Sequence, residues 1–368
     1  MKFICEKTSL AKALGLVGKT IPARPTHPIL SNIKIVAFEN KIEITAFDLS
    51  ISFVISQEAE VIEEGTELVC YKVFSDLIAK LPSGDVSIET GDDCVISSHR
   101  SVYHVPLSDI NEYPSIEDVN PTFFIDIPSQ SLVEGLKLPL VSTGEETQQI
   151  LTGINIKVKE DKITFASTDG KRLSVVNLTT DESFEKELEI TVPAKCLLDV
   201  VKAILAFDTE TIGLSMSDTR IQFDIGNATI ISRLLQGAFP AYPSLIPQSF
   251  TTEFFANRKD IISSVERATV ISSSMNQLIM FSVDPETRDM VISVETKDIG
   301  AGREVVQSIT TGNPLELCFN AKFLLDGVKT LTSDEIVLKC NTPVSPVVIK
   351  PIDTTDVIYL VMPVQKRS

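Results

Sequence analysis

A threefold internal repeat is the feature that most constrains the fold of this 368-residue chain. Three segments share one pattern, in which a lysine is followed by an aspartate four residues later and by a second lysine seven or eight residues later. The segments are Tyr71–Leu81, Ala194–Ile204 and Ala321–Leu331. Their first lysines stand 123 and 127 residues apart, close to a third of the chain. Apolar residues recur between the charges at helical spacing, so the pattern predicts three amphipathic helices in one unit used three times.

The flanks of these helices repeat as well. Short alternating strands are predicted before and after each helix, and a second helix opens each unit, at Lys7–Lys19, Ser129–Val141 and Asn257–Ile271. Boundaries at Asn120-Pro121 and near Pro247 predict three domains, 1–120, 121–249 and 250–368. The fold class is α+β, with two helices packed on one face of an antiparallel sheet in each domain.

Charge is divided unevenly between the predicted helices and the rest of the chain. The whole chain carries 33 basic and 50 acidic side chains, a net charge of −17, which argues against broad binding to nucleic acid. The six predicted helices carry 13 basic and 6 acidic residues, whereas the remainder carries 20 basic and 44 acidic residues. Helices that share one face would therefore form a basic surface suited to a polyanion, although lysine also favours exposed helix positions for other reasons.

The cysteines and histidines exclude several kinds of chemistry. None of the six cysteines forms a C-x-x-C pair, so they are expected to be buried thiols in a reducing cytoplasm. The chain has three histidines and no G-x-S-x-G elbow, so neither a shared metal nor a hydrolase triad is predicted. No apolar run is long enough to cross a membrane, and the N-terminus lacks a secretory pattern. We therefore expect a cytoplasmic protein that uses no metal and no cofactor.

Five short motifs stand in a fixed order on this repeat. They are Met1-Lys2-Phe3, the segments Arg24–Leu30, Thr168–Leu173 and Gly237–Pro243, and the ending Tyr359–Val364. Together they resemble the bacterial DNA polymerase III beta subunit, the sliding clamp, over the whole chain. The resemblance implies a head-to-tail homodimer, hence a six-domain ring that encircles double-stranded DNA without sequence preference. It also implies a non-catalytic processivity factor that works in DNA replication at the nucleoid and tethers the replicative polymerase.

Basic residues on the helices, and one in the loop after the first helix, are the predicted DNA contacts. They are Arg24, Lys12, Lys72, Lys80, Lys195, Lys202, Lys322 and Lys329, to which we add the neutral pair Gln148 and Gln149. Lysines on flexible stems suit a ring that slides, because they contact phosphates without reading bases.

The resemblance also implies a hydrophobic peptide-binding pocket between the second and third domains. Its partners would be the DNA polymerase III alpha subunit, the clamp loader, other polymerases and mismatch-repair factors. The matching positions are Leu151, Thr168, Gly170, Lys171, Arg172, Leu173, Pro240, Ser244, Leu245, Phe323, Val344, Pro346, Leu360, Val361, Met362, Pro363 and Val364. Most are apolar and one is a methionine, which suits a pocket that accepts short peptides from several proteins.

For the dimer interface, we predict that the edge strand with Tyr103 and Val105 meets a helix of the partner subunit. That helix is the one that carries Val270 and Ile271. Such a contact would bury strand edges that are exposed in a single chain.

The chain departs from the resemblance at three places. Gln149-Ile150 stands where better-known relatives have two tyrosines, Ser244 stands at a basic position of the pocket rim, and Gln365–Ser368 extends past the usual end. Two other functions stay open. One is an enzyme with a site between repeats that uses Asp169 and Lys171, which altered pKa values in a titratable cluster would favour. The other is a scaffold that binds only proteins, which a lack of DNA binding at low salt would favour.

Overall fold

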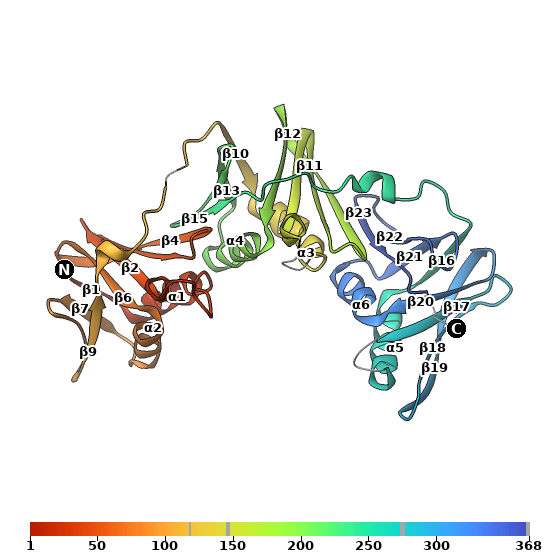
Figure 1. The fold of residues 1–368 in the computed structure, drawn as a ribbon, viewed down its shortest axis with the longest axis horizontal. Helices are drawn as coiled ribbons and strands as arrows, with labels where there is room; N and C mark the ends of the chain where they lie inside the picture. The colour runs from red at the N-terminus through yellow and green to blue at the C-terminus, as the bar shows by residue number, and fades with distance from the viewer. Residues whose placement is uncertain (118, 145–147, 273–276, 366–368) are drawn as a thin grey trace. The chain divides into compact units, whose positions relative to one another are not determined.

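The computed structural model describes residues 1–117, 119–144, 148–272 and 277–365. Each third of the chain repeats one order of elements, in which a strand, a helix and several strands are followed by a second helix and three strands (Figure 1). The first third contains β1 (Lys2–Glu6), α1 (Lys7–Val17), β2 (Asn32–Phe38), β3 (Lys41–Phe47), β4 (Ile51–Glu58), β5 (Glu60–Glu63), β6 (Gly65–Cys70), α2 (Tyr71–Lys80), β7 (Asp85–Thr90), β8 (Asp93–Ser98) and β9 (Ser101–Ser108).

The second and third repeats follow the same order. The second contains β10 (Phe123–Pro128), α3 (Ser129–Leu140), β11 (Gly153–Thr168), β12 (Arg172–Pro193), α4 (Ala194–Phe207), β13 (Thr211–Met216), β14 (Arg220–Ile225) and β15 (Ala228–Arg233). The third contains β16 (Thr252–Asn257), α5 (Arg258–Ile271), β17 (Leu278–Val283), β18 (Asp289–Thr296), β19 (Gly300–Gly312), β20 (Leu315–Asn320), α6 (Ala321–Thr330), β21 (Glu335–Cys340), β22 (Val347–Pro351) and β23 (Val357–Val361).

The predicted helices all form, and their ends shift by one to three residues. Helix α1 ends at Val17, because the amide of Gly18 donates to the Leu14 carbonyl at 3.0 Å and closes the last turn. Asn257 is the N-cap of α5 and not its first helical residue, since its side chain accepts a hydrogen bond from the Lys259 amide. Among the described residues, no helix is both long and apolar enough to cross a membrane.

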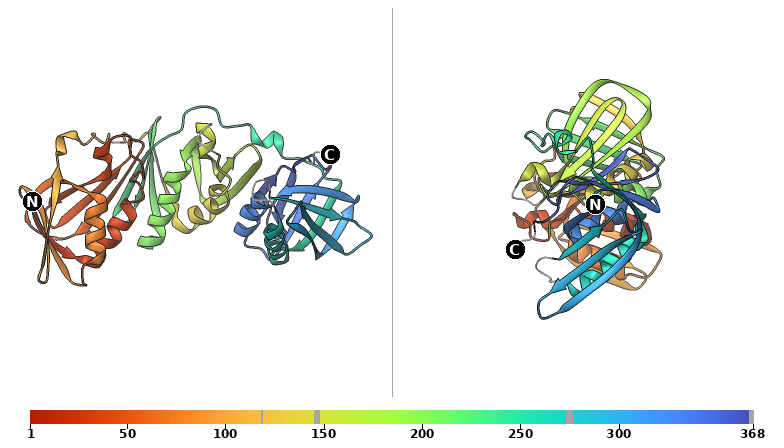
Figure 2. Two further views of the ribbon diagram at one scale, coloured as in Figure 1. Left: turned by 60° about the horizontal axis from the view of Figure 1, so that its bottom comes forward. Right: turned by 90° about the vertical axis from the view of Figure 1, so that its right-hand side faces the viewer.

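In the first and third repeats the two helices pack side by side. Helix α1 lies against α2, and α5 lies against α6 (Figures 1 and 2). A Cβ atom on Gly18 would stand only 1.8 Å from the Tyr71 hydroxyl oxygen, so a glycine is what lets α1 and α2 approach this closely. In the third repeat, Val265 of α5 and Leu324 of α6 are fully buried in the core that includes Phe281 and Phe319. The helices therefore present only their outer faces to solvent.

The chain forms two compact units, each built on one sheet. The first unit is Met1–Val133 with Lys195–Leu234, and the second is Glu134–Ala194 with Leu235–Ser368. The strand order is β10-β13-β14-β15-β4-β3-β2-β6-β9-β8-β7-β1-β5 in the first sheet and β11-β12-β23-β22-β21-β16-β19-β18-β17-β20 in the second. Each sheet therefore joins strands of neighbouring repeats, which the repeat pattern alone does not predict.

One antiparallel junction occurs in both units. The last strand of a repeat pairs with the strand that follows a tight turn in the preceding repeat. In the first unit β15 pairs with β4, with Ser232 opposite Ile51, and in the second unit β23 pairs with β12, with Val361 opposite Arg172. Within the described residues, the corresponding strands β9 and β19 keep an open edge, since residues 101–106 pair only with β8 and residues 300–307 pair only with β18. One chain thus contains two closed junctions and the two halves of a third.

Candidate functional site

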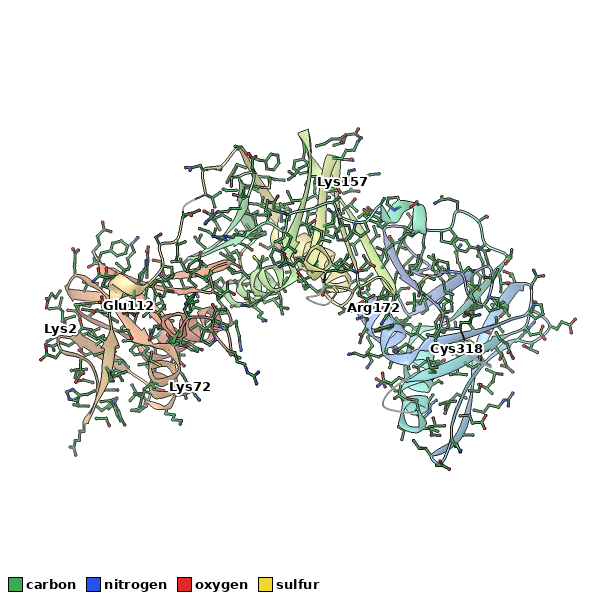
Figure 3. All side chains as sticks on the ribbon, viewed as in Figure 1. Lys2, Lys72, Glu112, Lys157, Arg172 and Cys318 are labelled. Carbon is green, nitrogen blue, oxygen red and sulfur yellow. The ribbon has the colours of Figure 1, made fainter. Side chains whose placement is uncertain are left out.

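The basic residues predicted to contact DNA lie on the outer faces of the helices or next to them. Arg24 is exposed in the loop between α1 and β2, and Lys72 and Lys80 are exposed at the two ends of α2 (Figure 3). Lys322 is exposed in the first turn of α6. These four cations form no ion pair with any residue that the structure describes, so their charge is available to an outside anion.

Three of the predicted DNA contacts are already neutralised by carboxylates. Lys195 Nζ lies 2.6 Å from Asp48 Oδ2, and Lys202 Nζ lies 3.2 Å from Asp199 Oδ1. Lys329 Nζ lies 2.6 Å from Glu266 Oε1. Such pairs reduce the local positive potential that draws a polyanion. The helix charge counted from the sequence therefore overstates the free positive charge on α4 and α6.

The same neutralisation affects α5. Lys259 pairs with Asp334 at 3.0 Å, and Arg267 pairs with Glu304 at 2.5 Å. These partners hold the pKa values of both carboxyl groups below their usual range, first through the hydrogen bond from the cation. Of the four unpaired cations among the predicted DNA contacts, Arg24, Lys72 and Lys80 lie in the first repeat and Lys322 lies in the third.

Lys12 and the two glutamines are placed differently. Lys12 Nζ donates to the Ala206 carbonyl at 2.5 Å and lies 5.3 Å from the centre of the Phe207 ring, so it bridges α1 and α4. Gln148 and Gln149 are exposed where the 3-10 turn η3 (Gln149–Thr152) begins. The neighbouring Leu151 is 7% exposed and so presents little apolar surface.

The turn between β11 and β12, which carries part of the predicted peptide pocket, is held by local hydrogen bonds. Asp169 Oδ1 accepts hydrogen bonds from the amides of Lys171 and Arg172, at 2.9 and 3.0 Å. Gly170 adopts a φ of 81°, which favours glycine, and Thr168 Oγ1 donates to the Arg172 carbonyl at 2.6 Å. Local hydrogen bonds therefore fix the Thr168–Leu173 motif as a rigid corner.

Three further segments meet at this corner. The Met362 amide donates to the Lys171 carbonyl at 2.9 Å, which places the end of β23 beside the turn. Helix α6 also lies beside the turn, since Arg172, which is labelled in Figure 3, donates to Asp326 of that helix. Leu173 and Leu360 are buried in a small cluster that the linker before β16 covers with Phe239, Tyr242, Ile246 and Phe250.

The pocket residues divide into a buried wall and an exposed apolar rim. Thr168, Arg172, Leu173, Leu360 and Val361 are buried. The most exposed apolar side chains are Leu245 and Val344, each 54% exposed, and Met362, which is 36% exposed. Gly170, Lys171, Pro240 and Ser244 are exposed, and Phe323, Pro346, Pro363 and Val364 are intermediate. The structure thus gathers the turn, β23, α6 and the linker, and it leaves apolar side chains available to a ligand.

Several residues at the pocket were not predicted from the sequence. The linker residues Tyr242 and Phe239 stack edge to face at 6.2 Å, and burial raises the pKa of Tyr242. Asp326 holds Arg172 and was counted only as part of the repeat pattern. The recurrence of this aspartate in the repeat does not indicate the role by itself, because the equivalent Asp76 is exposed.

The residues predicted for the dimer interface differ in exposure. Val270 in the last turn of α5 is 81% exposed and Tyr103 on β9 is 39% exposed. Val105 is only 2% exposed, so its side chain is not available at the surface, whereas Val102 on the same strand is 58% exposed. Ile271 packs on its own chain, since a Cβ atom on Gly302 would stand 3.0 Å from its Cδ1 atom.

The groups suggested for an enzyme do not form a reactive cluster. Both carboxylate oxygens of Asp169 are engaged by the turn and by Arg172, and Lys171 Nζ lies 5.7 Å from the Phe323 ring. Burial raises the thiol pKa values of Cys5, Cys94, Cys196 and Cys340 to about 12, so these cysteines stay protonated. In the described part of the chain, no group of His, Cys, Asp and Glu residues is arranged to hold a metal.

Comparison with known proteins gives matches over the whole chain. Three models of the DNA polymerase III beta subunit match in order, the N-terminal domain at residues 1–117, the central domain at 128–241 and the C-terminal domain at 243–365. The chain is 34% identical to the beta sliding clamp of Synechococcus elongatus, with 100% of both chains covered, and 29% identical to that of Bacillus subtilis, with 99% and 100% covered. It also matches the crystal structure of the DNA polymerase sliding clamp from Bacillus subtilis, with a TM-score of 0.93, 27% identity and 100% of both chains covered.

Proposed function

Because the chain belongs to the DNA polymerase III beta subunit family, we propose that it is a sliding clamp, a non-catalytic ring that encircles duplex DNA and tethers the replicative polymerase. The observation that carries this function is the ordered match of all three family domains to a threefold repeat that spans the chain. The proposed domains are 1–120, 121–249 and 250–368. The proposed location is the cytoplasm, at the nucleoid.

The open strand edges support a homodimer. Both closed junctions pair the last strand of one repeat with the strand after the turn of the preceding repeat. Applied to the third pair, the same rule joins β9 of one subunit to β19 of the partner, head to tail. Two such contacts close a ring and leave no open edge at either place. Exposed Val102 on β9 and exposed Val305 on β19 supply apolar area for this contact.

The distribution of ion pairs supports a DNA surface dominated by the first repeat. Arg24, Lys72 and Lys80 form no ion pair with a described residue, whereas five cations of α4, α5 and α6 are paired with carboxylates and Lys322 of α6 is unpaired. A closed ring needs only weak contacts, because topology and not affinity keeps it on DNA. A modest, localised charge guides the duplex and still permits sliding.

Neutralising the unpaired cations is expected to weaken DNA binding measurably. In Arg24→Gln/Lys72→Gln/Lys80→Gln, the slope of log affinity against log salt concentration falls in magnitude by about 0.9 for each phosphate that the protein no longer neutralises. Fluorescence anisotropy of a labelled duplex, titrated over a series of low salt concentrations, measures that slope.

A variant with the same net charge change is the control for this experiment. It replaces three cations that are already paired, Lys195→Gln/Lys202→Gln/Lys329→Gln. We expect a smaller change of slope, since these lysines must first leave their carboxylates to release a counterion from DNA. Equal slopes for the two variants would contradict the assignment of the DNA surface to the first repeat.

The pocket at the corner of β12, β23 and α6 is proposed to receive the partners. These are the DNA polymerase III alpha subunit, the clamp loader, other polymerases and mismatch-repair factors, each through a short peptide with an apolar end. Exposed Leu245, Val344 and Met362 provide the surface that such an end would bury. Two of the departures, Gln149-Ile150 and Ser244, remove aromatic and basic side chains next to the proposed surfaces. Of the extension Gln365–Ser368, residues 366–368 lie outside the described residues.

A further inference from the structure

We propose that Arg172 is a positioning residue of the peptide pocket. Two carboxylates hold its guanidinium, and the guanidinium stacks on the Phe323 ring and holds that ring in place. The ring, and not Arg172, contacts the peptide. The inference rests on the peptide-binding function proposed above and adds which residue sets the shape of the pocket wall. It is carried by the contacts of Arg172 and by a comparison between the two junctions of the chain.

The side chain of Arg172 is buried, and its guanidinium binds two carboxylates. Its side chain is 9% exposed. Nε donates to Asp169 Oδ2 at 3.0 Å, and Nη1 donates to Asp326 Oδ2 at 2.7 Å. Its Cζ atom lies 4.7 Å from the centre of the Phe323 ring, within the range of a cation–π contact. An arginine whose Nε and Nη1 bind two separate carboxylates is suited to hold other groups and has little freedom to follow a ligand.

The two carboxylates connect the turn to helix α6. Asp169 shapes the turn with Oδ1 and holds Arg172 with Oδ2. Asp326 lies three residues after Phe323 on α6, so both side chains project from the same face of that helix. Arg172 therefore sets the distance between the turn and the face of α6 that carries the ring.

The backbone under the ring is held by Tyr359, whose side chain also interacts with Arg172. Tyr359 is fully buried, and its hydroxyl donates to the Phe323 carbonyl at 2.5 Å. A Cβ atom on Gly327 would stand 2.0 Å from the Tyr359 ring, so a glycine lets α6 lie directly on this tyrosine. With the backbone held by Tyr359, the remaining freedom of Phe323 is the rotation of its ring, and Arg172 stacks on that ring.

The junction in the first unit has the same turn and backbone hydrogen bonds, but it lacks the arginine and the aromatic ring. Asp48 Oδ1 accepts from the amides of Ser50 and Ile51 at 3.0 and 2.7 Å, just as Asp169 does in the second unit. Leu49 has a φ of 76°, matching the 81° of Gly170. The Arg233 amide donates to the Ser50 carbonyl at 3.0 Å, matching the bond from Met362 to Lys171. Both junctions therefore offer the same framework.

The two junctions differ in the side chains at the positions that form the wall of the peptide pocket. Ile51 replaces Arg172, and Cys196, which is fully buried, replaces Phe323. The second carboxylate oxygen of Asp48 pairs with Lys195. The first junction thus lacks both the arginine and the ring.

A double-mutant cycle between Arg172 and Phe323 tests the inference. Arg172→Met keeps an apolar stem of similar length and removes the guanidinium. It is expected to weaken binding of a fluorescent Gln-x-x-Leu-x-Leu peptide about fivefold or more, with circular dichroism used to check that the variant is folded. In a Phe323→Leu background, Arg172→Met is expected to add less than about twofold, because the residue through which it acts is already gone. Arg172→Lys, which reaches one carboxylate and stacks poorly, is expected to fall between wild type and Arg172→Met.

Two further variants keep the result interpretable. Asp326→Asn weakens the ion pair between Arg172 and helix α6. It replaces Arg172→Met in the experiment if that variant does not fold. Asp48→Asn makes the equivalent change at the other junction and is expected to leave peptide affinity unchanged. Unchanged affinity for both Arg172→Met and Asp326→Asn, or fully additive effects in the cycle, would overturn the positioning role. A wild-type chain that binds no such peptide would contradict the peptide-binding function itself, and the role of Arg172 with it.

Discussion

A chain that carries Val102→Asp and Val270→Asp is expected to be a folded monomer. Both valines are exposed in the single chain, 58% and 81%, so the changes leave the core of the subunit intact. In the ring they would be buried at the β9–β19 contact and at the end of α5. Two carboxylates desolvated at each interface cost about 3 kcal/mol or more, which weakens association more than a hundredfold. Analytical ultracentrifugation gives the mass, and circular dichroism confirms that the chain is folded.

The control for the monomer experiment is Ile62→Asp. Ile62 is 54% exposed on β5, an edge strand at the far end of the first sheet, and it has no role in the proposed contact. This variant is expected to sediment as a dimer of about twice the 40.3 kDa chain mass. Ile271 is left unchanged, because it packs on its own chain and its replacement would also perturb folding. A double variant that still sediments as a dimer would show that the interface lies elsewhere.

Met362→Asp is expected to weaken binding of the peptide at least tenfold and to leave the dimer intact. The Met362 side chain is 36% exposed on the rim, while its backbone amide is held by Lys171, so the substitution changes the surface and not the strand. A peptide of the type Gln, two spacers, Leu, a small residue and Leu or Phe buries two large apolar side chains, each contributing about 1.5–3 kcal/mol before ordering costs. A carboxylate beside them must be desolvated, and about 1.4 kcal/mol already gives a factor of ten.

Isothermal titration calorimetry measures this difference, with a wild-type dissociation constant expected near 1 μM, about −8 kcal/mol. Ile309→Asp is the control, since Ile309 is 68% exposed on β19 and lies outside the residues assigned to the pocket. Equal affinities of wild type and Met362→Asp would place the peptide site on another surface.

The sequence predicted the helices and the domain repeat well because their signals are local. In each repeat, the first lysine marks the exposed face of one helix, and apolar residues at helical spacing mark the buried face. The α+β class followed from that pattern. The joining of strands across repeats did not follow from it, because the pairing of β15 with β4 depends on residues that lie more than 170 positions apart.

The candidate site could be predicted in outline and not in its electrostatics. The Thr168–Leu173 motif identified a turn, and the structure adds that Asp169 and Asp326 hold Arg172 there. Counting charge on helices overstated the free positive charge, since the partner of Lys195 is Asp48, 147 residues away in the sequence. Ion pairs between distant segments depend on the fold and leave no local pattern in the sequence.

The central claim, that the chain encircles DNA, is tested most directly by retention on circular and linear DNA. The wild-type dimer is placed on a nicked circular plasmid with a bacterial clamp loader and ATP, and free protein is removed by gel filtration at about 0.5 M salt, where contacts to phosphates are strongly weakened. We predict that the protein stays with the circular DNA and dissociates once a restriction enzyme cuts the plasmid, because the ring slides off the new ends. Release from the circle by salt alone, or equal retention on circular and linear DNA, would contradict encirclement and, with it, the function proposed for this chain.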